Sequence, residues 1–149
     1  MDKVNHKEQA LRYFSDKFHC SQAVVAAFAG ECGITEEQAL KLGSCFGSGM
    51  RKGEVCGACT GALMVLGLLR GQCRKGDVEE RQRSNIVNDR MMDRFQEENG
   101  SYICSDLLGC DMSTPEGAQY AREKGLFVDF CPKMVASAVD ILEDILTEK

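Results

Sequence analysis

The chain has 149 residues, of which 44% are hydrophobic and 28% charged, and its net charge is −5. This length suits one domain with a buried core, and the composition is that of a folded protein rather than a disordered one. The negative charge argues against a nucleic-acid-binding protein, because such proteins normally carry a basic face. We therefore expect a single domain over residues 1–149 and no nucleic-acid partner.

The N-terminal segment, MDKVNHKEQALRYF, is polar and charged and does not resemble a signal peptide. The longest apolar run, residues 56–69, has 14 residues, whereas a membrane-spanning helix needs about 20. We therefore expect a cytoplasmic protein without a membrane span.

Helical patterns occupy the first third of the chain. Residues 4–17 predict an amphipathic helix, and residues 20–32 predict a second helix that ends at Gly33. Thr35 and Gln38 have the spacing of a capping box, which predicts a helix from there to about residue 45. Four glycines between residues 43 and 53 then interrupt regular structure.

The segment 56–70, CGACTGALMVLGLLR, is apolar on every side. A helix with this pattern is expected to lie in the centre of its domain. Gly57 and Gly61 lie one turn apart on the same face of this helix. Because they lack side chains, they leave a groove where another backbone or a cofactor can approach closely.

The second half of the chain is also helical in pattern. Residues 78–98 predict a long amphipathic helix, and its expected buried side carries Ile86, Val87, Met91 and Phe95.

Three further helices are expected after Gly100: a short one capped by Ser101, one that begins at Thr114 and Pro115, and a last one that begins at Cys131 and Pro132. No segment alternates with period two for long enough to predict a strand. The expected fold class is therefore all-α, a single-domain bundle of about six to seven helices around the central helix at about 56–70.

Cysteine is the unusual component, with nine residues. They are Cys20, Cys32, Cys45, Cys56, Cys59, Cys73, Cys104, Cys110 and Cys131. An odd number in a chain without a secretion signal is a poor disulfide framework, so metal ligation or thiol chemistry is favoured. The alternative for any one of them is that a free cysteine packs as a small hydrophobic residue.

Four cysteines fall at or near the N-termini of four expected helices, namely Cys20, Cys56, Cys104 and Cys131. The first turn of a helix carries unpaired N–H groups and a partial positive charge, which lower the pKa of a thiol. An iron–sulfur cluster on four thiolates is anionic and is tuned by hydrogen bonds to its sulfurs. The spacings of 36, 48 and 27 residues are long, so the tertiary fold would have to assemble such a site.

Cys59 is ambiguous. With Cys56 it forms a CxxC motif at a helix N-terminus, as in thioredoxin-type thiols. Those motifs follow a strand in an α/β fold, however, and this chain shows no strand pattern. Cys59 is an extra ligand, a resolving thiol or a small residue that faces the core, and these alternatives remain open.

The other cysteines have simpler interpretations. Cys32 and Cys45 lie near expected helix C-termini, where a thiolate is disfavoured, and Cys110 is expected to pack. Cys73 lies in a polar loop and is expected to be an exposed thiol. Arg51, in the glycine-rich loop, could offset the charge of a nearby anionic cluster.

The motifs FHCSQAVVAAFA, GSGMRKGEVCGACTGALMVLG, ICSDLLG and EGAQYAREKGLFVDFCPKMVASAVDIL occur in that order. Together they resemble the C-GCAxxG-C-C family of redox-active proteins over nearly the whole chain. The resemblance implies that Cys20, Cys56, Cys104 and Cys131 are the four signature cysteines and that they hold a prosthetic group, an iron–sulfur cluster. It also implies a redox partner protein or an oxidoreductase or transporter system.

The first hypothesis is thus a metal site in which the four signature cysteines bind a [2Fe–2S] or [4Fe–4S] cluster for electron transfer or redox sensing. Cys59, Gly57, Gly61 and Arg51 are candidate accessory residues. The second is thiol–disulfide chemistry, by Cys56 with Cys59 or by a pair among the four, and the third is a structural zinc site. The sequence shows no catalytic constellation, so it assigns no enzymatic activity, and it leaves a homodimer open.

Overall fold

The computed structural model describes residues 5–148. Within them the regular structure is helical apart from one isolated antiparallel bridge, between Val55 and Ile103. The elements are α1 (His6–Ser15), α2 (Cys20–Ala27), α3 (Ala29–Cys32), α4 (Glu36–Gly43), η1 (Gly49–Gly53), α5 (Gly57–Arg70), α6 (Val78–Asn99), α7 (Cys104–Leu108), α8 (Pro115–Glu123), α9 (Leu126–Asp129) and α10 (Cys131–Thr147). The prediction of an all-α bundle is confirmed.

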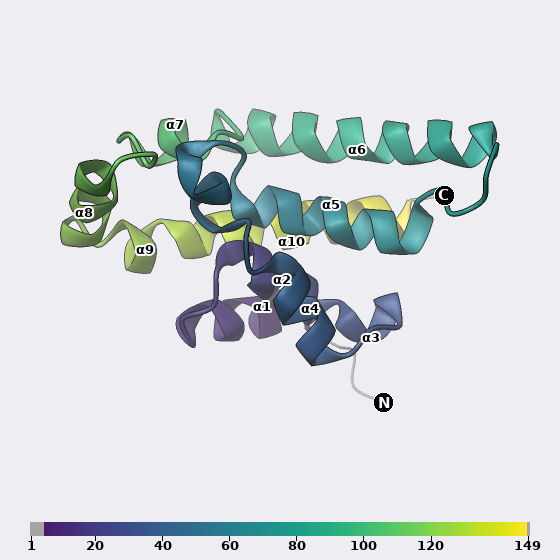
Figure 1. Ribbon diagram of the computed structural model, residues 1–149, viewed down its shortest axis with the longest axis horizontal. Helices are drawn as coiled ribbons and strands as arrows, with labels where there is room; N and C mark the ends of the chain where they lie inside the picture. The colour runs from purple at the N-terminus through teal and green to yellow at the C-terminus, as the bar shows by residue number, and fades with distance from the viewer. Residues whose placement is uncertain (1–4, 149) are drawn as a thin grey trace.

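Three long helices, α5, α6 and α10, run along the long axis of the molecule and pack against one another (Figure 1). Helices α1 to α4 lie on one side of this layer, and the short helices α7, α8 and α9 lie together at one end. Helix α5 packs against α2, α6 and α10, as expected of the central helix, and α10 also contacts α1, α2 and α9. The central position is therefore shared by α5 and α10.

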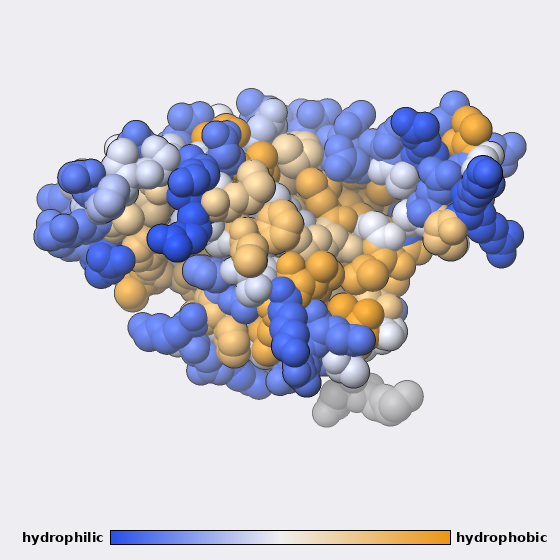
Figure 2. All heavy atoms as spheres, in the orientation of Figure 1, coloured by the Kyte–Doolittle hydropathy of each residue, from blue (hydrophilic) through white to orange (hydrophobic). Residues whose placement is uncertain are grey.

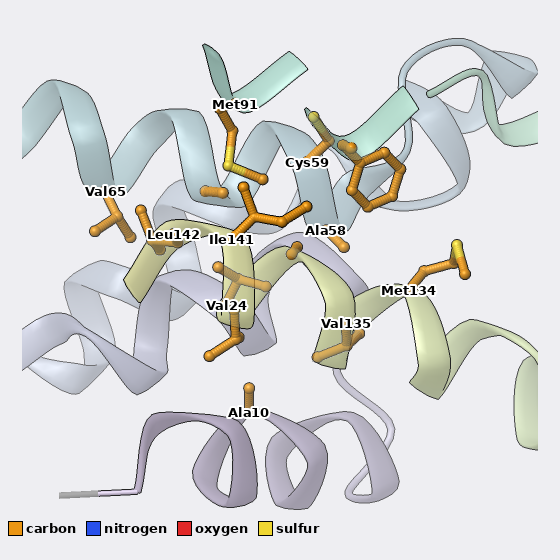
Figure 3. Close-up of a cluster of buried hydrophobic side chains, with 14 of the residues drawn as sticks. Ala10, Val24, Ala58, Cys59, Val65, Met91, Met134, Val135, Ile141 and Leu142 are labelled. Atoms are coloured by element: carbon orange, nitrogen blue, oxygen red, sulfur yellow. The ribbon is translucent and has the colours of Figure 1, made fainter. Parts of the chain in front are cut away.

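The core forms where these helices meet. Val24 of α2, Ala58 of α5, Met91 of α6 and Ile141 of α10 are fully buried, and their side chains point toward one another (Figure 3). The apolar stripe of the last helix supplies the largest share, with Met134, Val135, Ala138, Val139, Ile141, Leu142 and Ile145 in the core. Burial of these side chains is the main favourable term that holds the helices together.

The outer surface differs between helices. Hydrophilic side chains line α6, whereas hydrophobic surface gathers over α5 (Figure 2). The last turn of α5 exposes Leu68 and Leu69, and α4 exposes Leu42. None of the helices described over residues 5–148 is both long enough and apolar enough to cross a membrane. A homodimer through the exposed apolar surface stays a prediction.

The helix ends follow the sequence signals closely. Gln38 donates its backbone N–H to the Thr35 hydroxyl at 3.0 Å, and the Gln38 side chain accepts from the Thr35 N–H at 2.9 Å, as the capping box predicts. The Thr114 hydroxyl accepts from the Gly117 N–H at 3.0 Å, and Pro115 is the first helical residue of α8. Gly33 adopts the left-handed conformation, with φ of 71°, at the end of α3.

Several details differ from the predictions. The expected helix over 20–32 is broken at Phe28 into α2 and α3, and α9 was not predicted. Ile86 is 59% exposed, so its placement on the buried side of α6 was wrong. The neighbouring Val87 packs against the core with Met91 and Phe95, and at about 100° per residue Ile86 falls on a different face of the helix. Ser101 does not cap α7, because Ile103 precedes the helix and donates its N–H to the Ser101 hydroxyl. The first helix covers His6–Ser15, and residue 4 of its expected range lies outside the described residues.

Candidate functional site

The four signature cysteines lie at the N-terminal ends of four helices. Cys20 is the first residue of α2, Cys104 of α7 and Cys131 of α10, while Cys56 immediately precedes α5. Cys56, Cys104 and Cys131 are buried, and Cys20 is half-buried. The expected location of these cysteines at helix N-termini is therefore confirmed.

Cys56 and Cys104 are brought together by the β-bridge. The Cys56 N–H donates to the Tyr102 carbonyl at 2.8 Å, and the Cys104 N–H donates to the Glu54 carbonyl at 2.6 Å. The chain segments that carry the two thiols thus run side by side, 48 residues apart in sequence. Since the two residues pair in this way at the N-terminal ends of their helices, α5 and α7 start next to each other.

Cys20 approaches Cys56 because glycine follows Cys56. A β-carbon added to Gly57 would lie 3.4 Å from the Cys20 β-carbon and 3.2 Å from the Ser21 nitrogen. One turn later, a β-carbon on Gly61 would lie 2.9 Å from the Ser21 carbonyl oxygen. The two glycines therefore let the backbones of α5 and α2 pack in close contact, which confirms the groove that the sequence predicted and identifies α2 as its occupant.

All four signature cysteines line a common cavity. Cys20 and Cys131 lie near enough to each other for the interaction between their thiols to shift both pKa values. Cys56 and Cys104 are close enough for their charges, with that of Cys131, to raise the pKa of Cys20. The cavity has a volume of about 1050 Å³, and each of the four cysteines lines it.

In the metal-free protein, burial disfavours the charged thiolate and so raises the pKa of a buried cysteine. It raises the pKa of Cys56 to about 11, although the N–H groups of Ala58 and Cys59 hydrogen-bond the sulfur and lower the pKa. It also raises the pKa of Cys104 to about 12, and the neighbouring thiols Cys56 and Cys131 add to the effect. The expected N–H donors are present, but the prediction that a helix N-terminus lowers the thiol pKa is wrong at these two positions, because desolvation is larger.

Cys20 and Cys131 behave as a pair. The interaction with the neighbouring Cys131 thiol, together with burial, raises the pKa of Cys20 well above its ordinary value. Cys20 in turn lowers the pKa of Cys131, in spite of the burial of that thiol.

Positive charge reaches the cavity from the glycine-rich loop. Ser48, Gly49, Met50 and Arg51 are consecutive residues with positive φ, between 53° and 62°. This left-handed turn costs about 1–2 kcal/mol for each non-glycine residue, so it must be held by its surroundings. It brings Arg51 and the following Lys52 to the lining of the cavity, so Arg51 lies in the same site as the four cysteines.

Two further cationic residues of the lining, Lys17 and Arg122, were missed from the sequence. Lys17 follows α1, and Arg122 lies in the last turn of α8. Nothing in the local sequence marks either one, because only the tertiary fold brings the two segments to the same cavity.

Cys59 is not part of the cavity lining. Its side chain is fully buried in the core cluster of Figure 3, and its thiol donates to the Met92 sulfur at 3.3 Å. Burial raises the pKa of Cys59 to about 12. Of the three roles left open for Cys59, the structure matches the small residue that faces the core.

The other cysteines lie outside the group of four. Cys32 is the last residue of α3 and Cys45 follows the end of α4, so both lie at helix C-termini as expected. Cys73 is exposed, as predicted. Cys110 packs against the Met112 sulfur at 3.7 Å.

The donor chemistry of the site can be compared with what a metal group needs. Over residues 5–148, no three histidine, cysteine or carboxylate side chains form a group that could hold one metal ion. The four thiols instead surround a larger cavity, with backbone N–H groups on the Cys56 sulfur and cationic side chains in the lining. Thiols, N–H donors and positive charge are the groups that hold and tune an iron–sulfur cluster, so the residues fit one chemically.

Comparison with known proteins agrees with this arrangement. A family model described as "Putative redox-active protein (C_GCAxxG_C_C)" matches residues 18–145, which include all four cysteines of the cavity. Searches of curated proteins and of solved structures return no match to this chain. The match covers most of the sequence. The chain therefore belongs to the C_GCAxxG_C_C family of redox-active proteins.

Proposed function

We propose that the protein binds an iron–sulfur cluster through Cys20, Cys56, Cys104 and Cys131 and uses it for electron transfer or redox sensing. The observation that carries the proposal is that four thiols, one from the start of each of four helices, line a single cavity. The partner would be a redox protein, such as an oxidoreductase or a component of a transporter system.

The high pKa values of Cys56 and Cys104 are consistent with this role. Neutral buried thiols are the stable form of the metal-free site, and metal binding releases their protons. A bound cluster would supply reversible one-electron chemistry. The chain itself would hold the cluster by four sulfurs, donate the Ala58 and Cys59 N–H groups to the Cys56 sulfur, and limit access of water by burial.

Reconstitution with ferrous iron and sulfide under anaerobic conditions tests the ligand assignment. The wild type and a Cys32→Ala variant should both gain visible absorption and iron, because Cys32 lies outside the cavity lining. Cys56→Ala should lose most of both signals, since a thiolate ligand is removed. Equal iron and sulfide in Cys56→Ala and the wild type would show that Cys56 is not a ligand.

A second candidate function is favoured by the proximity of Cys20 and Cys131, which line the same cavity and shift each other's pKa. Two neighbouring thiols can form a disulfide: both S–H bonds break, one S–S bond forms, and two protons and two electrons pass to an oxidising disulfide, which becomes a dithiol. Titration of free thiols against dithiothreitol redox buffers should then show a two-electron step. That step should disappear in Cys20→Ala and persist in Cys59→Ala, and its absence from the wild type would exclude this function.

A further inference from the structure

The cavity extends well beyond the four thiols. Apolar side chains from several segments form its walls, among them Phe14, Leu108, Met112, Phe127 and Phe130. Its volume of about 1050 Å³ lies at the upper end of the range of about 300–1,000 Å³ that is typical of small-molecule sites. The cysteines thus make up only one part of a site that has room for an organic molecule.

The charged residues of this lining all have the same sign. They are Lys17, Arg51, Lys52 and Arg122, and no aspartate or glutamate lines the cavity in the part of the chain that the structure describes. None of these four cations forms an ion pair with a carboxylate of residues 5–148. In a chain of net charge −5, a cavity lined by cations alone is a local reversal of the overall charge.

The side chains that line the cavity differ in how far they are exposed to solvent. The four cations are exposed, and Phe14, Phe127 and Phe130 are half-buried. Leu108 and Met112 are buried, as are three of the four cysteines. The cations therefore form the exposed edge of the cavity, here called its mouth, whereas Leu108, Met112 and three of the four cysteines belong to its buried part.

We propose that this cavity binds a small organic anion whose acidic group lies among Lys17, Arg51, Lys52 and Arg122 and whose apolar body packs against the aromatic walls. Apolar walls with a few charged groups that fix orientation are the usual composition of a small-molecule site. Arginine is well suited to carboxylate, sulfonate and phosphate groups, because its planar guanidinium donates two parallel hydrogen bonds. The ligand would then share the cavity with the four thiols, as a redox substrate or a regulator of the site would.

This inference does not depend on which redox group the thiols form. It can be tested with the fluorescent anion 8-anilinonaphthalene-1-sulfonate and with the neutral dye N-phenyl-1-naphthylamine, using the full chain as purified. The anion should bind with a stoichiometry of about one, and its affinity should fall with salt, as expected of exposed charges. Arg51→Glu and Arg122→Glu should each weaken it roughly tenfold, since each replaces a charge-assisted contact by repulsion.

Matched controls separate this result from unfolding and from unspecific adsorption. Arg74→Glu changes the same charge in the loop between α5 and α6, outside the cavity lining, and should leave the affinity unchanged. Neutral dye binding and the thermal midpoint should be the same in all variants. Equal anion affinity in Arg51→Glu, Arg122→Glu and Arg74→Glu, or no saturable binding to the wild type, would overturn the proposal, whatever the iron content of the protein.

Discussion

The contact between α2 and α5 can be tested with two alanine substitutions on one helix. Gly61 and Gly67 both lie within α5. A β-carbon on Gly61 would lie 2.9 Å from the Ser21 carbonyl oxygen, whereas a β-carbon on Gly67 would have no neighbour within 4 Å. Ser21 has little freedom to move, because it is fully buried and its hydroxyl donates to the Gly43 carbonyl at 2.6 Å.

The expected energies follow from this geometry. Gly67→Ala should stabilise the protein by about 1 kcal/mol, because alanine is the better helix former. Gly61→Ala gains the same propensity but forces the two helices apart, and overpacking of this kind costs about 1–3 kcal/mol. The two variants should therefore differ by about 2 kcal/mol in unfolding free energy, which is about 4–8 °C in Tm for a chain of this size.

Thermal unfolding of the metal-free proteins under reducing conditions, followed by far-UV circular dichroism, measures this difference. Urea titration supplies the free energies independently. If Gly61→Ala raises Tm as much as Gly67→Ala does, the backbones of α2 and α5 do not pack as closely as the structure shows, and the argument for the groove is refuted.

Three further predictions concern the site and its surroundings. Gly57→Ala should lower the iron bound on reconstitution more than it lowers stability, because its β-carbon would crowd the Phe46 carbonyl oxygen at 3.1 Å and the Ser21 nitrogen at 3.2 Å and so displace the backbone that carries Cys20; equal losses would contradict this. Cys59→Ala should keep the wild-type iron content and lose about 1 kcal/mol of stability, as for a small buried group; loss of iron would instead make Cys59 a ligand. Burial and a 2.7 Å hydrogen bond to Glu36 raise the pKa of Tyr13 to about 12 from a usual 10. The stability that this raised pKa contributes is present below pH 10 and is lost as the pH rises through 12. In urea unfolding, Tyr13→Phe should therefore lose less unfolding free energy at alkaline pH than the wild type does. An equal loss would contradict the raised pKa of Tyr13.

Local signals in the sequence predicted most of the helices. Thr35, Gly33 and Thr114 mark helix ends by chemistry that needs no distant partner, and the structure has helix ends at each of them. The same local logic placed the four cysteines at helix N-termini. The prediction for Ile86 failed because a hydrophobic residue beside the stripe was assigned to it: Val87, Met91 and Phe95 share one face at helical spacing, and Ile86 does not.

The assembly of the site could not be predicted in this way. The pairing of Val55 with Ile103 is a single bridge between distant segments, too short to leave an alternating pattern. The cationic mouth joins Lys17 and Arg122, which lie more than 100 positions apart. The thiol pKa was misjudged because burial is a property of the folded chain and at Cys56 it outweighs the two N–H donors.

The central claim is that four thiols meeting at one cavity hold an iron–sulfur cluster. The most direct measurement is the content of iron, zinc and acid-labile sulfide per chain in protein purified without oxygen. The proposal predicts iron and sulfide in equal amounts, two or four of each per chain according to cluster type, with little zinc. One zinc per chain without sulfide, or neither metal in a protein that also fails to take up iron and sulfide, would contradict it.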